Sequence, residues 1–230
     1  MRFETAVAPE SPAIDPQEFV STLESSLSQG RVEEALHRVR ARWTAGQIVA
    51  LLADKSPDVR KVAALALSLV GDAGAIAPLA LALHDGDAMV AQVAEHSLWS
   101  VWFRLGSPQA ICLVKCGNNH LHHGNYVCAL EKFSQAIQED GKFAEAYNQR
   151  AIAHYLSDRF DESIADCKAA LVLVPQHFGA MSGMGHAHAH LGNWCDARHC
   201  YRLALAIHPR LEGIATSREQ IEQLLRESPG

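Results

Sequence analysis

Residues 144–177, AEAYNQRAIAHYLSDRFDESIADCKAALVLVPQH, decide the fold of this chain. Small and apolar residues recur at helical spacing up to Asp158, a residue type that turns a chain at the end of a helix. A second segment with the same spacing begins near Phe160 and stops at Pro175, because proline cannot continue a helix. We therefore predict two helices joined by a short turn.

The same arrangement occurs on both sides of this stretch without an insertion. Ala110, Ala144 and Phe178 are equivalent starting positions, which gives a period of 34 residues. A helical hairpin cannot bury its apolar face alone, so repeated hairpins must stack into a solenoid. The eighth position of each unit holds a small residue, which is Gly117, Ala151 or Gly185. The fifteenth holds a turn residue, which is Gly124, Asp158 or Gly192. The seventeenth holds an aromatic residue, which is Tyr126, Phe160 or Trp194.

This pattern resembles the tetratricopeptide repeat, and the match covers residues 110–211. The resemblance implies an all-α fold, an alpha-alpha superhelix of helical hairpins. It also implies a capping helix over 212–227, where Ile214 and Ile221 stand among charged residues. We accordingly assign a tetratricopeptide (TPR) domain to residues 107–230, with units 110–143, 144–177 and 178–211.

A second repeat precedes this domain, with a period of 31 residues that relates Asp54 to Asp85 and Leu67 to Leu98. The segment from Asp54 to Leu67 has the form DxxxxVRxxAAxAL, which resembles the short HEAT-like repeat also found in phycobilin lyases. In this pattern Arg60 is expected to bond in the turn between two helices. We predict HEAT-like helical repeats over 15–106, following a disordered N-terminus over 1–14.

Composition limits the possible partners and compartment. The 230 residues carry a net charge of -6 and no basic stripe, which argues against nucleic-acid and acidic-membrane binders. No export signal or membrane span is evident. The six cysteines are spread through helical sequence, which favours reduced thiols and a cytoplasmic location.

The TPR resemblance implies a concave groove lined by the first helix of each unit. Amide, imidazole and apolar side chains at these positions suit an extended segment or an amphipathic helix of a partner protein. Glu145 is a further candidate. The predicted peptide-binding residues are Lys115, Asn118, His122, Asn148, Gln149, Ile152, Tyr155, Ser182, His186 and His190.

Some TPR domains hold the C-terminal carboxylate of a chaperone with a clamp of lysine, asparagine and arginine side chains. The matching positions here carry Val114, Asn118, Gln149, Gly179 and Gly183, so only the first-unit asparagine is retained. A carboxylate would find no charge-assisted partner at these positions. The sequence therefore predicts that chaperone-tail binding is disfavoured.

Three histidines alternate in GMGHAHAHLG, residues 183–192. On a helix, His186 and His190 share a face and could both reach one metal ion, whereas His188 lies on another face. The TPR resemblance implies that His188 packs between the two helices of its hairpin. No acidic residue accompanies them as in HExxH, so no metal ligand is assigned. No nucleophile elbow or phosphate loop occurs either, so no catalytic residue and no cofactor is predicted.

The function predicted from the sequence is a non-enzymatic protein-interaction scaffold that binds a partner peptide or helix in the TPR groove. One alternative is a HEAT-repeat lyase-like enzyme or enzyme subunit, which incubation with a bilin and its acceptor would test. The other is a histidine-based metal binder, which a metal assay on the purified protein would test.

Overall fold

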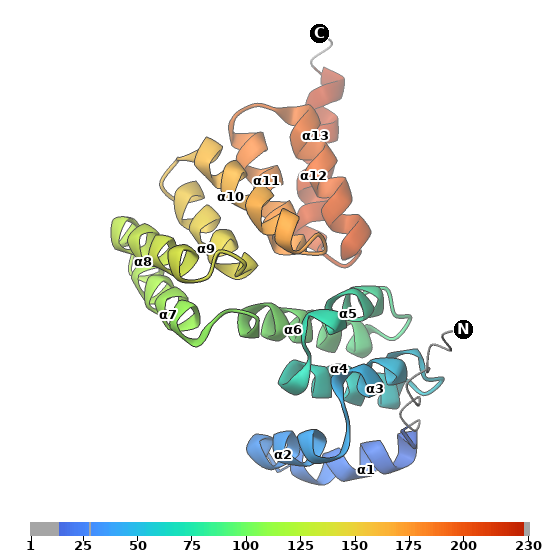
Figure 1. Cartoon of the computed structure of the whole chain (residues 1–230). Helices are drawn as coiled ribbons and strands as arrows, with labels where there is room; N and C mark the ends of the chain where they lie inside the picture. Colours follow the sequence, from blue (N-terminus) through green and yellow to red (C-terminus); the bar gives the residue numbers. More distant parts are fainter. Residues whose placement is uncertain (1–13, 28, 228–230) are drawn as a thin grey trace, which may run out of the picture.

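The structure is a computed structural model, and it describes residues 14–27 and 29–227. All regular secondary structure in these ranges is helical, and neighbouring helices are joined by short turns and stacked side by side (Figure 1). The predicted all-α solenoid is therefore confirmed. The segment predicted to be disordered lies outside the described residues, apart from Ile14. None of the helices in the described ranges has the length and apolar character needed to cross a bilayer.

The N-terminal array begins its helices at the signals its sequence carries. Thr44 forms a capping box with Gln47, Pro57 occupies the first turn of its helix, and the Asp87 side chain accepts hydrogen bonds from two backbone N–H groups. The elements are α1 (Pro16–Leu27), α2 (Val32–Arg42), α3 (Ala45–Ala50), the short 3-10 turn η1 (Leu51–Ala53), α4 (Pro57–Val70), η2 (Ala73–Ala75), α5 (Ile76–Ala82) and α6 (Ala88–Arg104).

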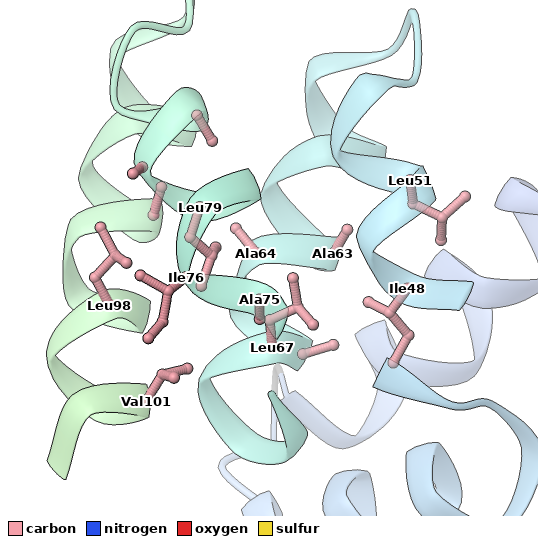
Figure 2. Packing of buried hydrophobic residues seen from close by; sticks show 14 of the residues in the cluster. Ile48, Leu51, Ala63, Ala64, Leu67, Ala75, Ile76, Leu79, Leu98 and Val101 are labelled. Atoms are coloured by element: carbon pink, nitrogen blue, oxygen red, sulfur yellow. The ribbon is translucent and has the colours of Figure 1, made fainter. Parts of the chain in front are cut away.

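The core of this array lies between α3, α4, α5 and α6, where small and large apolar residues interdigitate (Figure 2). Ala64 on α4 lies beside Leu79 from α5, Ala63 lies toward Ile48 from α3, and Leu98 and Val101 approach from α6. All of these side chains are buried. The array is thus a stack of helical hairpins, and its HEAT-like identity stays a prediction.

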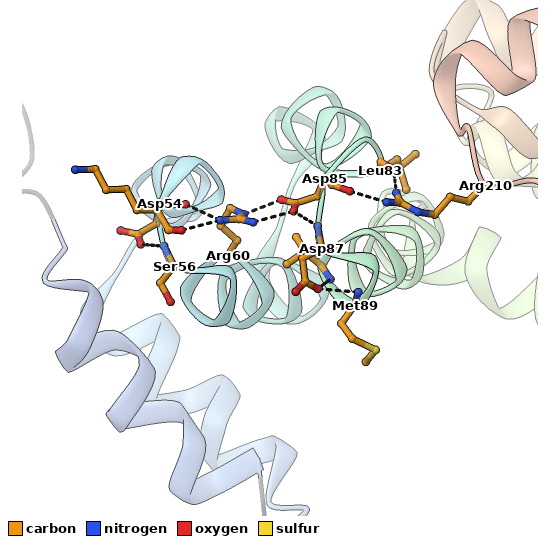
Figure 3. A network of polar contacts seen from close by, with 10 residues as sticks. Asp54, Ser56, Arg60, Leu83, Asp85, Asp87, Met89 and Arg210 are labelled. Atoms are coloured by element: carbon orange, nitrogen blue, oxygen red, sulfur yellow. Dashed lines mark hydrogen bonds and ion pairs between the residues drawn. The ribbon is translucent and has the colours of Figure 1, made fainter.

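Arg60 joins successive units of the N-terminal array (Figure 3). Its Nη1 donates to the Asp54 carbonyl oxygen at 2.9 Å, in the turn where the sequence predicted a bond. Its Nε and Nη2 donate to the two carboxylate oxygens of Asp85 at 2.7 and 2.8 Å. This fork holds the pKa of the Asp85 carboxyl below its ordinary value. Asp85 is the repeat equivalent of Asp54, so the arginine of one unit bonds the aspartate of the next unit.

The C-terminal array contains the three predicted hairpins and the helix after them. Its turn residues Gly124, Asp158 and Gly192 have φ values of 72°, 58° and 74°, which explains why the fifteenth position favours glycine or aspartate. The helices are α7 (Pro108–His122), α8 (Tyr126–Glu139), α9 (Ala144–Tyr155), α10 (Phe160–Leu173), α11 (Phe178–His190), α12 (Trp194–Ile207) and α13 (Glu212–Glu227).

Close helix packing accounts for the small residue at the eighth position of each unit. A Cβ atom placed on Gly185 would lie 2.6 Å from the ring of Tyr201 on the second helix of the same hairpin. Gly117 is covered by the Phe133 ring in the same manner. A larger residue at either glycine would force the helices of its hairpin apart.

The two arrays form one continuous body, because α6 runs beneath the loops that separate the C-terminal units (Figure 1). At the far end, Arg210 donates hydrogen bonds to the backbone oxygens of Leu83 and Asp85 at 2.7 and 2.6 Å (Figure 3). Each inter-unit loop has a contact on α6, and these contacts are Phe103 with Phe143, Trp102 with His177 and Glu95 with His208.

Candidate functional site

A pocket of about 140 Å³ opens between α9, α10 and α11, in the predicted groove. Its walls are almost entirely apolar, and Ile152 at its edge is exposed. Four of the predicted groove residues meet here. We call this the groove pocket; it is lined by Asn148, Ala151, Ile152, Tyr155, Ser163, Cys167, Gly183 and His186.

His186 is held by its neighbour on α12. Its Nδ1 shares a hydrogen bond with the Tyr201 hydroxyl at 2.8 Å. Burial raises the pKa of Tyr201 to about 12, so the phenol keeps its proton. Burial also lowers the pKa of His186, and the nearby His190 adds to this effect. The pocket therefore carries a neutral histidine at pH 7.

His190 does not line the groove pocket, but it packs against Tyr155, which does. Its ring stacks on Phe160, with centroids 4.8 Å apart and planes at 17°, and meets the Tyr155 ring edge-on at 5.2 Å. Phe160 is the aromatic residue at the seventeenth position of its unit. Throughout the described ranges, no group of three or more histidine, cysteine, aspartate or glutamate side chains is arranged to hold a metal ion.

The remaining predicted groove residues do not reach this pocket. Lys115 and His122 are exposed on α7, and the Ser182 hydroxyl donates to the Phe178 carbonyl within its own helix at 2.8 Å. Asn118 differs from them, because its Oδ1 is buried and accepts no hydrogen bond from any described residue.

Glu145, the further groove candidate, is buried at the junction of the arrays. Its carboxylate accepts from Gln149 Nε2 at 2.6 Å and from His177 Nε2 at 3.0 Å. His177 Nδ1 in turn accepts the Ala180 N–H at 3.1 Å, which fixes the proton on Nε2. The His177 ring stacks on Trp102, with centroids 4.1 Å apart and planes at 13°. We call Glu145, His177, Trp99, Trp102 and Phe178 the junction cluster.

The junction cluster was missed in the sequence analysis. Trp99 lies edge-on to His177 and Phe178, at 5.6 and 5.4 Å between centroids, and also covers Gly179. A Cβ atom on Gly179 would lie 2.6 Å from the Trp99 ring. Gly179 is one of the positions compared with the carboxylate clamp. Glycine is needed there because the Trp99 ring of α6 packs directly against it. The available signal was the pair Trp99 and Trp102, which share a helix face.

The cysteine at the groove pocket gives a direct test of the site's burial. Burial raises the pKa of the Cys167 thiol to about 12 and that of Cys200 to about 11, so neither forms a reactive thiolate at pH 8. We expect a disulfide reagent such as DTNB to titrate four thiols in the native protein and six after unfolding, since the other four cysteines are exposed. Rapid titration of a fifth thiol in folded protein would contradict the burial of Cys167 on α10 or of Cys200 on α12.

Comparisons with known proteins agree with this geometry. No protein-family model matches the chain. Human tetratricopeptide repeat protein 12 is 29% identical over 103 residues, covering 45% of this chain and 15% of that protein. A TPR repeat-containing protein of Rhizobium etli is 26% identical over 129 residues, covering 56% of this chain and 62% of that protein. The chain thus spans less than two thirds of the length of these curated relatives.

Solved structures show the same arrangement of helices. The first TPR domain of Spaghetti (RPAP3), bound to the HSP90 peptide SRMEEVD, superposes with a TM-score of 0.52 at 24% identity, over 52% of this chain and 95% of that one. The C-terminal array has the TPR fold. The Sgt2 TPR domain of Aspergillus fumigatus gives a TM-score of 0.51 at 19% identity, over 54% of this chain and 87% of that domain.

One prediction about partners is wrong. Binding of a chaperone's carboxylate tail was predicted to be disfavoured, because the positions equivalent to the clamp, such as Val114 and Gly183, carry no cationic side chain. The Spaghetti TPR domain shares the fold of the C-terminal array and was solved with a peptide ending in such a tail. Residue types at a few aligned positions are therefore insufficient to set this class of partner aside.

Proposed function

We propose that the chain is a non-enzymatic protein-interaction scaffold whose TPR array binds a peptide segment of a partner along α7, α9 and α11. The observation that carries the proposal is the apolar groove pocket with the exposed side chain of Ile152 at its edge. Exposed apolar residues beside an apolar cavity are typical of a surface that a partner covers. Its cysteines, all of them free, fit a reducing compartment such as the cytoplasm.

The size of the groove pocket favours a peptide side chain as the bound group. Pockets for drug-sized molecules have volumes of about 300–1,000 Å³. The groove pocket has about 140 Å³, which suits one aliphatic side chain. Leu156, which is exposed one residue beyond Tyr155, extends the apolar surface along the groove.

Polar groups in the groove can hold the backbone of the same peptide. His186 lines the groove pocket, and because its Nδ1 is engaged with Tyr201, its Nε2 is the ring nitrogen left for a partner. Asn118 in the first unit offers a buried acceptor that has no partner among the described residues. A ring nitrogen at the pocket and an amide acceptor in the first unit match the needs of an extended segment with one inserted side chain.

Selection from a displayed peptide library that includes SRMEEVD tests this proposal. We expect enrichment of segments with an aliphatic residue, and a loss of affinity of about tenfold or more when Ile152→Glu is combined with Tyr155→Ala, because both changes remove apolar contacts at the pocket. Fluorescence anisotropy with the selected peptides gives the affinities. Circular dichroism checks that the variant is still folded.

Val172→Ala is the matched control, because Val172 is 82% exposed on α10 and lines none of the pocket. It is expected to leave the affinity unchanged. Failure of the wild-type chain to enrich any segment, or equal affinity in the double variant, would contradict the proposed groove.

A further inference from the structure

A second pocket, of about 500 Å³, lies between α12 and α13, and the groove proposal makes no use of it. Its lining is mainly polar. Three arginines and a histidine contribute to it, together with two acidic residues and one cysteine. We call it the arginine pocket; it is lined by Cys195, Asp196, Arg198, His199, Arg202, Arg218 and Glu222.

Helix geometry brings these side chains together. Arg198 and Arg202 are four residues apart on α12 and therefore share one of its faces. Arg218 and Glu222 have the same spacing on α13, which packs against α12. The two helix faces meet across the pocket and place three guanidinium groups around it.

These arginines lack the partners that other arginines of this chain have. Arg60 and Arg150 each form a two-bond fork with an aspartate, at 2.7–2.8 Å and 2.7 Å. Arg198 forms no hydrogen bond or ion pair with the described part of the chain. Arg202 has one contact, from Nη2 to His199 Nδ1 at 3.3 Å.

Arg218 is held only weakly. Its Nε lies 3.4 Å from Glu222 Oε1, and this buried nitrogen has no hydrogen-bond partner among the described residues. The Asp196 side chain is 68% exposed and forms no ion pair with the arginines of the pocket; its Oδ2 lies 4.0 Å from Nδ1 of His188, which is outside the pocket lining. The guanidinium groups are thus available to an external anion.

The charge and size of the pocket indicate the class of that anion. Three arginines face two carboxylates, which leaves a positive excess in a chain whose net charge is -6. The planar guanidinium fork matches the oxygens of phosphate and binds them through charge-assisted hydrogen bonds. The pocket is also larger than a bare anion needs. We infer that the arginine pocket binds a phosphate monoester, such as a phosphorylated side chain, independently of the groove.

Isothermal titration at low salt, with the phosphopeptide acetyl-Gly-phosphoSer-Gly-amide as probe, tests this inference. Saturable binding is expected for the wild-type chain, and none for the unphosphorylated peptide. Arg198→Gln with Arg202→Gln is expected to weaken binding by about tenfold or more, the effect of losing charge-assisted hydrogen bonds. Glu222→Gln is expected to strengthen binding, because it removes a competing carboxylate beside Arg218.

Arg226→Gln is the control, because Arg226 is exposed on the same helix but does not line the pocket. Circular dichroism confirms the fold of each variant. Lack of binding by the wild-type chain, or equal affinity in the double variant and the wild type, would overturn the inference. Inorganic phosphate that binds as tightly as the phosphopeptide would overturn the ester assignment.

Discussion

Replacing Trp102 by alanine is expected to lower the free energy of unfolding by about 3–5 kcal/mol, the usual cost of truncating a buried aromatic residue. Trp102 is 1% exposed and contacts three aromatic rings. It stacks on His177 at 4.1 Å and lies 5.0 Å from Trp99 and 5.2 Å from Phe178. These contacts join α6 to the TPR array, so the cavity would weaken the connection between the two arrays.

Urea unfolding of the Trp102 variants measures this effect, and small-angle scattering reports whether the arrays separate. Trp102→Phe is the matched comparison, because it keeps an aromatic ring in the cluster and removes an indole Nε1 that has no partner among the described residues. The phenylalanine variant should lose clearly less free energy of unfolding than the alanine variant. Leu81→Ala, at a residue 75% exposed on α5, should change stability by about 0.5 kcal/mol or less. If Trp102→Ala lowered the free energy of unfolding as little as Leu81→Ala does, the contacts of α6 would not stabilise the junction between the arrays.

Replacing Glu145 by alanine is expected to cost about 1–3 kcal/mol, because it leaves the buried Nε2–H of His177 without its hydrogen-bond partner. Glu145 is 1% exposed and His177 is completely buried. The change removes the acceptor of the His177 Nε2 hydrogen bond and also releases Gln149. The expected result is a lower unfolding midpoint.

Glu145→Gln separates loss of charge from loss of the acceptor. Its amide oxygen can still accept from His177, so we expect it to retain much of the stability that the alanine variant loses. Thermal and urea unfolding of both variants give the comparison. Equal losses for glutamine and alanine would show that the negative charge, rather than the hydrogen bond, stabilises the junction.

The parts of the fold that depend on local chemistry were predictable. Gly124, Asp158 and Gly192 mark the hairpin turns because a left-handed backbone conformation favours glycine or aspartate. Gly117 and Gly185 mark the close helix approaches for steric reasons. Such requirements recur in every unit, so a single sequence shows them as a period of 34 residues.

The junction between the arrays was not predictable in this way. Trp102 and His177 are far apart in the chain, and their contact depends on how the whole stack curves. A glutamate at a groove position is ordinarily exposed, yet Glu145 is buried because His177 and α6 cover it. The groove pocket was predictable only in part. Groove residues on α9 and α11, such as Ile152 and His186, were predicted, whereas Ser163 and Cys167 on α10 were not.

Hydrogen bonds link Asp54, Arg60, Asp85 and Arg210 into one series, and this series limits where a repeat unit could be added or lost. Repeat arrays commonly gain or lose whole units, because each unit contacts only its neighbours. Here a duplicated unit between α6 and α12 would shift Arg210 away from Asp85 and His177 away from Trp102. These two contacts therefore fix the number of repeats that lie between them, and a duplicated unit would be tolerated only outside that part of the chain.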